Sequence, residues 1–339
     1  MAALAAALLF GSGTALAKGL LASINPWLLA GLLYLGSGLG LTIYRGLRHS
    51  PEVRLPPGEW PWLAGAILTG GVIGPVLLMF GLTAMPASGA SLLLNAEGVF
   101  TALLAWFVFG ENFDRRIAVG MAAIVAGAGV LSWPEDSAPL NSLWPTLAVL
   151  GACFAWAIDN NLTCKVSLLD ASWLASIKGL SAGSVNLMLA FLLGARCPPW
   201  VSVAEALVVG WLAYGVSLTL FVVGLRHLGT ARTGAYFSIA PFFGAALSIL
   251  WLDEPVHSRL LLAGGLMGFG VWLHLTERHS HKHLHQVIEH EHDHEHDEHH
   301  QHTHNEPAQS EIKHAHWHRH EPIIHTHPHF PDRHHRHSH

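Results

Sequence analysis

The chain has 339 residues, of which 51% are hydrophobic and only 12% are charged, and its formal net charge is −5. A soluble globular protein carries roughly 25% charged residues, so this composition argues strongly against a soluble protein. No stripe of Lys and Arg is present, which argues against a nucleic-acid partner.

The sequence consists of two consecutive regions of different composition. Of the 27 histidines, all but His49, His227 and His257 lie at or after His274. An apolar body therefore extends to about residue 276, and a polar, histidine-rich tail follows over residues 277–339. The three cysteines form no CxxC pair, so we predict neither a disulfide framework nor a thiolate metal site.

The body contains ten apolar runs of a length that can cross a bilayer, which takes roughly 20 helical residues. We predict ten transmembrane helices, over residues 2–20, 26–44, 61–82, 87–109, 116–133, 144–164, 171–194, 201–225, 233–252 and 258–276. The short separators are rich in Pro and Gly. The first run ends in Ala-Leu-Ala, as a secretory signal does, but it lacks a basic start. We therefore interpret it as the first transmembrane helix.

Basic residues in the loops predict the orientation of the chain. The loops on the side of the N-terminus contain Arg45, Arg48, Arg54, Arg115, Arg116, Lys165, Arg226, Arg232, Arg278 and Lys282. The loops on the other side contain only Arg196 and Arg259. We therefore predict a multi-pass protein of the cytoplasmic membrane with both termini, and hence the tail, in the cytoplasm.

An internal repeat divides the body. Residues 81–111 align without a gap on residues 224–254, and the shared residues include Gly81/Gly224, Phe100/Phe243 and Glu111/Glu254. A looser match pairs Lys18 with Lys165. Because each half contains five helices, an odd number, the second half must enter the membrane inverted, which is a transporter architecture. The predicted fold is an all-α membrane protein with inverted five-helix repeats at 1–133 and 134–276.

Two features of the repeat resemble a known family. A helix that ends in Gly-Glu or Asp-Glu after "ALLAWFVF" or "AALSILWL", in a 5+5 layout, resembles the drug/metabolite transporter superfamily and, within it, the EamA-type permeases. The resemblance covers residues 1–276 and implies secondary transport of a small organic solute by alternating access. Pro241 fits the family pattern, whereas the first half has Gly98 there, preceded by Glu97. The tail lies outside the pattern.

Glu97 is the sharpest candidate site residue, because it lies in the middle of the apolar run "LLLNAEGVFTALL". A charged residue at the bilayer centre costs about 2.5–3.5 kcal/mol on insertion scales. We predict that Glu97 faces a central cavity and either couples transport to protons or binds a cationic group. The alternative is a paired or protonated structural carboxyl. Asn95 lies nearby but on a different face of the helix.

A second polar group, Asp159, Asn160 and Asn161, stands inside the sixth run. It predicts a cavity-lining helix, with a break at this point as one possibility and a position near the cytoplasmic interface as the alternative. Lys178, eight residues into the seventh run, is a candidate partner for an acid. Lys18 and Lys165 lie near helix ends and are expected to reach towards the interface. Glu111 and Glu254 are interpreted as structural helix-end residues.

The tail alternates histidine with carboxylates, which are ligands that suit Zn²⁺, Ni²⁺ or Cu²⁺. Candidate ligands are His290, His292, His294, His296, His299, His300, His302 and His304. A polar tract with few apolar residues is expected to be disordered, so we predict several weak sites that lose metal as the pH falls through the imidazole pKa of about 6.5. A solvated tail with no metal role is the alternative.

Three functions remain open from the sequence. The first is export or uptake of a small organic solute, with a metal-binding tail and no required cofactor. The second is export of a divalent cation such as Zn, Ni or Co, and the third is a membrane-anchored metal buffer or sensor. An enzyme is disfavoured because the body has no histidine in a helix core that could act as a base and no HExxH sequence. The lack of a Walker sequence argues against coupling to ATP. The lipid bilayer and a solute are the expected partners, with a homodimer left open.

Overall fold

The computed structural model describes residues 1–50, 53, 55–109, 115–133, 143–166, 170–221, 223–224, 233, 236–276, 280–284, 289–294, 314–319 and 324–328. The chain divides into two compact units, Met1–Glu277 and Arg278–His339. All regular secondary structure among the described residues of the first unit is helical, and the unit corresponds to the apolar body. The second unit corresponds to the histidine-rich tail.

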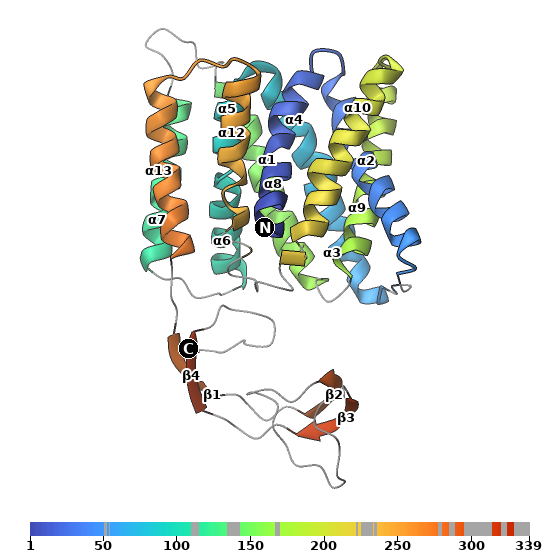
Figure 1. Ribbon diagram of the computed structural model, residues 1–339, viewed down its shortest axis with the longest axis vertical. Helices are drawn as coiled ribbons and strands as arrows, with labels where there is room; N and C mark the ends of the chain where they lie inside the picture. The colour runs from blue at the N-terminus through green and yellow to red at the C-terminus, as the bar shows by residue number, and fades with distance from the viewer. Residues whose placement is uncertain are drawn as a thin grey trace. The chain divides into compact units, whose positions relative to one another are not determined.

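The body is a bundle of antiparallel helices (Figure 1). Its first half contains α1 (Ala2–Leu20), α2 (Pro26–Leu47), η1 (Pro57–Glu59), α3 (Trp60–Ala66), η2 (Ile67–Ile73), α4 (Gly74–Ala84), α5 (Ala87–Leu93), α6 (Ala96–Phe109) and α7 (Arg115–Ser132). Its second half contains α8 (Trp144–Lys165), α9 (Ala171–Leu192), α10 (Trp200–Gly210), η4 (Trp211–Val216), α12 (Ala240–Trp251) and α13 (Ser258–Leu275). The segments η2 and η4 are π-helical.

Within the described residues, eight helices or continuous helix series are long and apolar enough to cross a membrane. The other two predicted runs are occupied by α8 and by the 12-residue helix α12. Helix α8 is long enough, but Asp159, Asn160 and Asn161 make it more polar than the rest. The fold is therefore that of an all-α membrane protein, as the sequence predicts.

Glycine allows the closest helix contacts in the bundle. A Cβ atom added at Gly36 of α2 would lie 2.2 Å from the carbonyl oxygen of Leu207 in α10. One added at Gly210 of α10 would lie 2.0 Å from the carbonyl oxygen of Leu33 in α2. The two backbones thus touch through positions where no side chain fits, which is how helices associate tightly in a bilayer.

The two halves share structural features at equivalent positions of the repeat. The π-helical segments η2 and η4 correspond, and each lies in the third helix of its half. The fourth helix of the first half is interrupted at Leu94 and Asn95, and the corresponding turn at Ser238 and Ile239 precedes α12. Helix α8 packs on α4 and α6, while its counterpart α1 packs on η4 and α12. The halves interlock through these exchanged contacts.

The break that the sequence left open near Asp159 is absent, because α8 continues through that region without interruption. The interruption in this part of the bundle lies instead at Leu94 and Asn95, between α5 and α6. The polar side chains of α8 find partners on neighbouring helices, as described below. The α8 backbone can therefore keep its own hydrogen bonds, and these residues do not require an open helix.

Four short strands occupy part of the tail: β1 (Ser280–Leu284), β2 (Glu289–His294), β3 (His314–Arg319) and β4 (Ile324–Pro328). Strand β1 pairs antiparallel with β4, and β2 pairs antiparallel with β3. These segments differ from the predicted disorder. The His-x-His pattern alternates with a period of two, which is also the side-chain period of a strand.

Candidate functional site

A largely buried ion pair joins α8 and α9. The Nζ atom of Lys178 lies 2.5 Å from Oδ1 and 2.7 Å from Oδ2 of Asp159. The hydroxyl of Thr163, one turn further along α8, donates to Asp159 Oδ1 over 2.8 Å. The side chains of Lys178 and Asp159 are only 18% and 9% exposed. The Asp159 carboxylate is therefore bound by Lys178 and Thr163 at a position with little access to water.

Glu97 lies in the first turn of α6, directly after the interruption that follows α5. Its Oε1 atom accepts a hydrogen bond of 2.9 Å from Nδ2 of Asn160, which also lies 3.3 Å from the hydroxyl of Thr101. The positive end of the α6 dipole favours a carboxylate at this position. Glu97 thus faces α8 across the boundary between the two halves.

The charges at this place do not cancel. Two carboxylates, Glu97 and Asp159, approach the Asn160 region of α8, whereas Lys178 is the cation that binds one of them. The charges of Glu97 and Lys178 also attract each other. With all three groups ionised the cluster carries one negative charge, which a bilayer interior tolerates poorly. A proton or a cationic group bound at Glu97 would neutralise it.

The remaining predicted residues lie beside this cluster or away from it. Asn161 donates to the carbonyl oxygens of Thr101 and Ala157, at 3.3 and 2.9 Å, and so joins α8 to α6. Asn95 is 8% exposed and donates to the carbonyl oxygen of Leu92, which satisfies the end of α5. The structure thus gathers Glu97, Asp159, Asn160, Asn161 and Lys178 and leaves Asn95 in the helix interruption.

A second polar group surrounds the π-helical segment η2. The Tyr34 hydroxyl and the Trp156 indole N–H both donate to the carbonyl oxygen of Gly70, at 2.7 and 2.9 Å. The side-chain amide of Asn186 donates to the carbonyl oxygen of Gly71 over 3.0 Å. A Cβ atom at Gly70 would lie only 1.8 Å from Asp159 Oδ2, so η2 and the ion pair are in direct contact.

Sequence reasoning missed this second group. Tyr34, Trp156 and Asn186 each carry a polar tip inside an apolar run, and that signal was available. Their partners, however, are backbone carbonyl groups that the π-helical geometry leaves accessible, and no residue pattern marks those groups.

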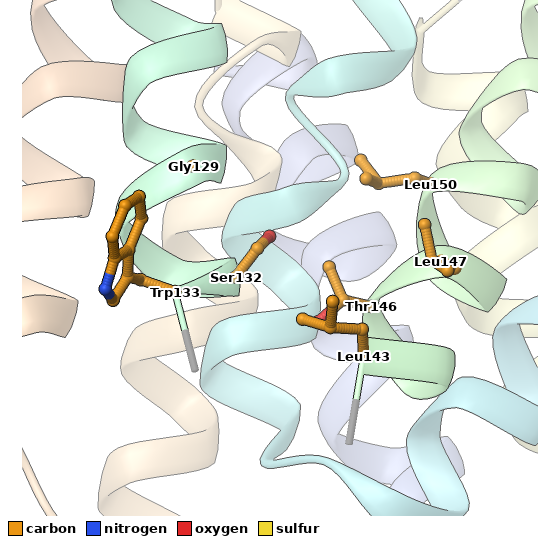
Figure 2. Close-up of a pocket in the computed structure, with 7 residues that line it drawn as sticks. All are labelled: Gly129, Ser132, Trp133, Leu143, Thr146, Leu147 and Leu150. Carbon is orange, nitrogen blue, oxygen red and sulfur yellow. The ribbon is translucent and has the colours of Figure 1, made fainter. Parts of the chain in front are cut away.

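A cavity of about 230 Å³ lies between α7 and α8, away from the charged cluster (Figure 2). It is lined by Gly129, Ser132, Trp133, Leu143, Thr146, Leu147 and Leu150. The hydroxyl of Ser132 is already bonded to the Ala128 carbonyl oxygen over 2.6 Å. This apolar cavity offers no charge to a solute, so the charged cluster is the stronger candidate site.

Lys18 and Glu254 lie at the end of the bundle where α4 meets α5. Lys18 donates to the carbonyl oxygens of Leu82 and Met85, at 2.5 and 3.1 Å, at this end of the bundle. Leu82 lies in the last turn of α4 and Met85 follows the helix, so these carbonyl groups lack partners within it. Glu254 accepts hydrogen bonds from the backbone N–H groups of Ala87 and Ser88, at 2.6 and 2.8 Å.

The tail histidines are described in part. His290, His292 and His294 lie in β2, where the register places them opposite His318, His316 and His314 of β3. The other candidate ligands, His296, His299, His300, His302 and His304, lie outside the described residues. Where the structure describes side chains, it shows no group of three or more His, Cys, Asp or Glu that could hold a metal ion.

Comparisons with known proteins agree with a transporter. The chain is 28% identical to an uncharacterized transporter of Methanothermobacter thermautotrophicus, over 79% of this chain and 83% of that protein. It is 28% identical to a probable terminal-alkyne amino-acid exporter of Streptantibioticus cattleyicolor, over 63% of this chain and 73% of that protein. It is 27% identical to a probable amino-acid metabolite efflux pump of Escherichia coli, over 56% of this chain and 68% of that protein.

The fold has a counterpart among solved structures. One crystal structure superposes with a TM-score of 0.61 over 81% of this chain and 98% of its own, at 19% identity. The model of the EamA-like transporter family matches residues 1–133 and 143–276, which is nearly all of the apolar body. The chain therefore belongs to the EamA-like transporter family, and it is a multi-pass membrane transporter and not an enzyme.

Proposed function

We propose that the protein exports a small organic solute with an amino group, in exchange for protons, by alternating access across the cytoplasmic membrane. The single observation that carries this proposal is the charged cluster formed by Glu97, Asp159 and Lys178. It lies on α6, α8 and α9, so both halves of the bundle contribute to it. A binding site between the halves is where alternating access operates.

Charge balance supports exchange with protons. Lys178 compensates Asp159, whereas Glu97 is held by the neutral amide of Asn160. Glu97 can therefore alternate between a bound proton and the ammonium group of a solute without any change in the net charge of the site. An amino acid or a close derivative supplies such an ammonium group.

The relatives support the same class of solute. Two of the similar proteins are named as an amino-acid exporter and as an amino-acid metabolite efflux pump. Their similarity covers more than half of this chain and more than two thirds of each relative. Together with the uncompensated carboxylate of Glu97, this favours a solute with an amino group over a purely apolar one.

Further parts of the proposal concern the organisation of the chain. The body consists of two inverted repeats, residues 1–133 and 134–276, with both termini in the cytoplasm.

The tail, residues 277–339, binds divalent metal as an appendage. Its support is the ligand chemistry and the β2–β3 register, which sets three histidines against three others. If the tail instead collects cargo, the protein is a divalent cation exporter, which truncation of the tail would reveal.

The test is transport by purified protein in liposomes, with a pH gradient and a panel of radiolabelled amino acids. We expect a pH gradient to accelerate transport of at least one of them, and Glu97→Gln to abolish that acceleration. Glu205→Gln is the matched control, because Glu205 is an exposed residue of α10 and receives the same chemical change. If Glu97→Gln transports as the native protein does at every gradient, the role assigned to Glu97 is wrong.

A further inference from the structure

At one end of the bundle, a three-element contact joins the halves of the protein. Glu254 lies in the segment between α12 and α13, in the second half, and its two carboxylate oxygens accept from Ala87 and Ser88, the first residues of α5 in the first half. Lys18, near the end of α1, donates to the carbonyl oxygens of Leu82 and Met85. Both sides of the turn between α4 and α5 are therefore held by charged side chains.

This contact replaces the usual helix caps. Pro86 precedes α5 and gives no side-chain cap, so the N–H groups of Ala87 and Ser88 depend on Glu254. An ionised acceptor at a helix N-terminus forms stronger hydrogen bonds than a neutral one. Lys18 and Glu254 also attract each other across the turn. The Glu254 part of the contact joins the two halves, so it must break if they separate at this end.

Helix α5 connects the contact to the candidate site. All seven of its residues, from Ala87 to Leu93, are buried. The interruption at Leu94 and Asn95 follows, and Glu97 stands in the first turn of α6. A displacement of the start of α5 is thus transmitted along about two turns of helix to the interruption beside Glu97.

The position of the contact permits it to open and close. Glu254 is only partly buried, and Thr83, Ala84 and Pro86 beside it are exposed. When the carboxylate leaves α5, water can reach both the carboxylate and the freed N–H groups. A fully buried contact of this kind would leave those groups without partners, at a cost of about 1–3 kcal/mol for each.

We infer that Glu254 and Lys18 form a gate, defined by these two residues together with the α4–α5 turn at Met85 and Pro86. The gate is closed in this structure and must release α5 when the transporter opens towards this end of the bundle. This inference rests on the proposed function, because it assumes that the two halves move relative to each other. Glu254 acts as a positioning residue, since it holds α5 and does not touch the candidate site.

The experiment measures access to the gate without a transported solute. Cys153, Cys164 and Cys197 are replaced by alanine, and Ser88, which is 2% exposed, is replaced by cysteine. The rate at which a charged, membrane-impermeant maleimide labels this cysteine reports how often the gate is open. Glu254→Gln retains the size of the side chain but loses its charge and one of its two acceptors. Lys18→Met removes the cation from the other side of the turn.

We expect each gate variant to raise the labelling rate roughly tenfold, which corresponds to about 1.4 kcal/mol. Asp253→Asn is the matched control, because it removes a negative charge from the adjacent, exposed residue of the same segment. Asn tolerates the positive φ of 51° at that position, so the backbone should not change. Labelling in this control should equal that of the parent protein.

The gate inference is overturned if both Glu254→Gln and Lys18→Met are labelled at the parental rate while eluting as folded protein in detergent. It is also overturned if Asp253→Asn raises the rate as much as they do, because the effect would then be one of general charge. Failure of the proposed function would look different. No solute in the panel would be transported, while Glu254→Gln and Lys18→Met would still be labelled faster than the parent protein.

Discussion

At the scale of single residues, Lys178 is important because it compensates a carboxylate that has little access to water. We predict that Lys178→Met destabilises the protein by about 3 kcal/mol, since removal of one partner leaves a buried charge alone. The double variant Asp159→Asn/Lys178→Met should recover much of that loss, because neither charge remains. Unfolding in SDS-containing mixed micelles would measure both. Equal destabilisation by the single and double variants would contradict this account of the pair.

Asp170, just outside the membrane-spanning part of α9, should make stability depend on pH. Burial raises the pKa of its carboxyl, but hydrogen bonds from the Ser172 hydroxyl and the Trp173 N–H, together with the charge of Arg45, outweigh burial and lower the pKa. Its contribution is therefore present above the unfolded pKa of about 3.9 and is lost as the pH falls through the lower folded value.

The corresponding variant is Asp170→Ala, which removes the N-cap of α9. We expect it to lower stability by about 1 kcal/mol at pH 7, the usual effect of losing such a cap. Thermal unfolding in detergent between pH 7 and pH 3 should show the difference from the native protein shrinking as the pH falls. A difference that does not depend on pH would indicate that the charge of Asp170 contributes nothing.

Isolated charges were the most predictable residues of the site. Glu97, Asp159 and Lys178 stand out because an ionisable group in an apolar run must be paired or neutralised. The sequence could suggest that Lys178 pairs with an acid, but it could not say which one. That choice depends on how α8 packs on α9. Thr163 was overlooked because a threonine in a helix ordinarily bonds its own backbone and signals nothing.

At the scale of helices, the π-helical segment η2 provides a sharp test, because Gly70 lies against the ion pair. We predict that Gly70→Ala abolishes or strongly reduces transport, since its Cβ atom would lie 1.8 Å from Asp159 Oδ2 and must displace that carboxylate. Gly265→Ala is the matched control, because a Cβ atom there meets nothing within 4 Å. Liposome transport of the two variants should differ although each adds one methyl group.

If Gly70→Ala transports normally, η2 does not determine the position of Asp159. If both variants lose transport, the assay reports general intolerance of the bundle to added methyl groups. Purified protein of each variant should also be compared by thermal unfolding, because a folded Gly70→Ala protein without transport is the outcome that supports the prediction.

The positions of most helices could be predicted from hydropathy, because a bilayer demands long apolar runs. The interruption between α5 and α6 and the π-helical segments could not. They depend on which backbone groups find partners on neighbouring helices, as Gly70 and Gly71 do with Tyr34, Trp156 and Asn186. Hydropathy measures side chains, and these features belong to the backbone.

At the scale of the whole molecule, the repeat accounts for more of the architecture than any single motif does. An odd number of helices in each half forces the halves to be inverted, and the structure places π-helical segments, helix interruptions and exchanged helix contacts at matching positions. The charged residues of the candidate site do not follow the repeat in the same way. Glu97 corresponds to Ala240, so the candidate site breaks the symmetry and gives the two halves different chemical roles.

The last prediction concerns the tail, which the family model does not cover. Protein truncated after Thr276 should insert and transport any non-metal solute at the native rate, because the described candidate site lies wholly within residues 95–178. The full chain should bind more Zn²⁺ than the truncated protein at pH 7.5 and release it near pH 5, since protonated imidazole cannot bind metal. Equilibrium dialysis against Zn²⁺ measures this difference directly.

Equal metal content in both proteins would exclude a metal-binding tail. If transport of the solute disappears with the tail while insertion is normal, the tail belongs to the transport mechanism. If truncation lowers only Zn²⁺ transport, the divalent cation exporter becomes the better account of this protein.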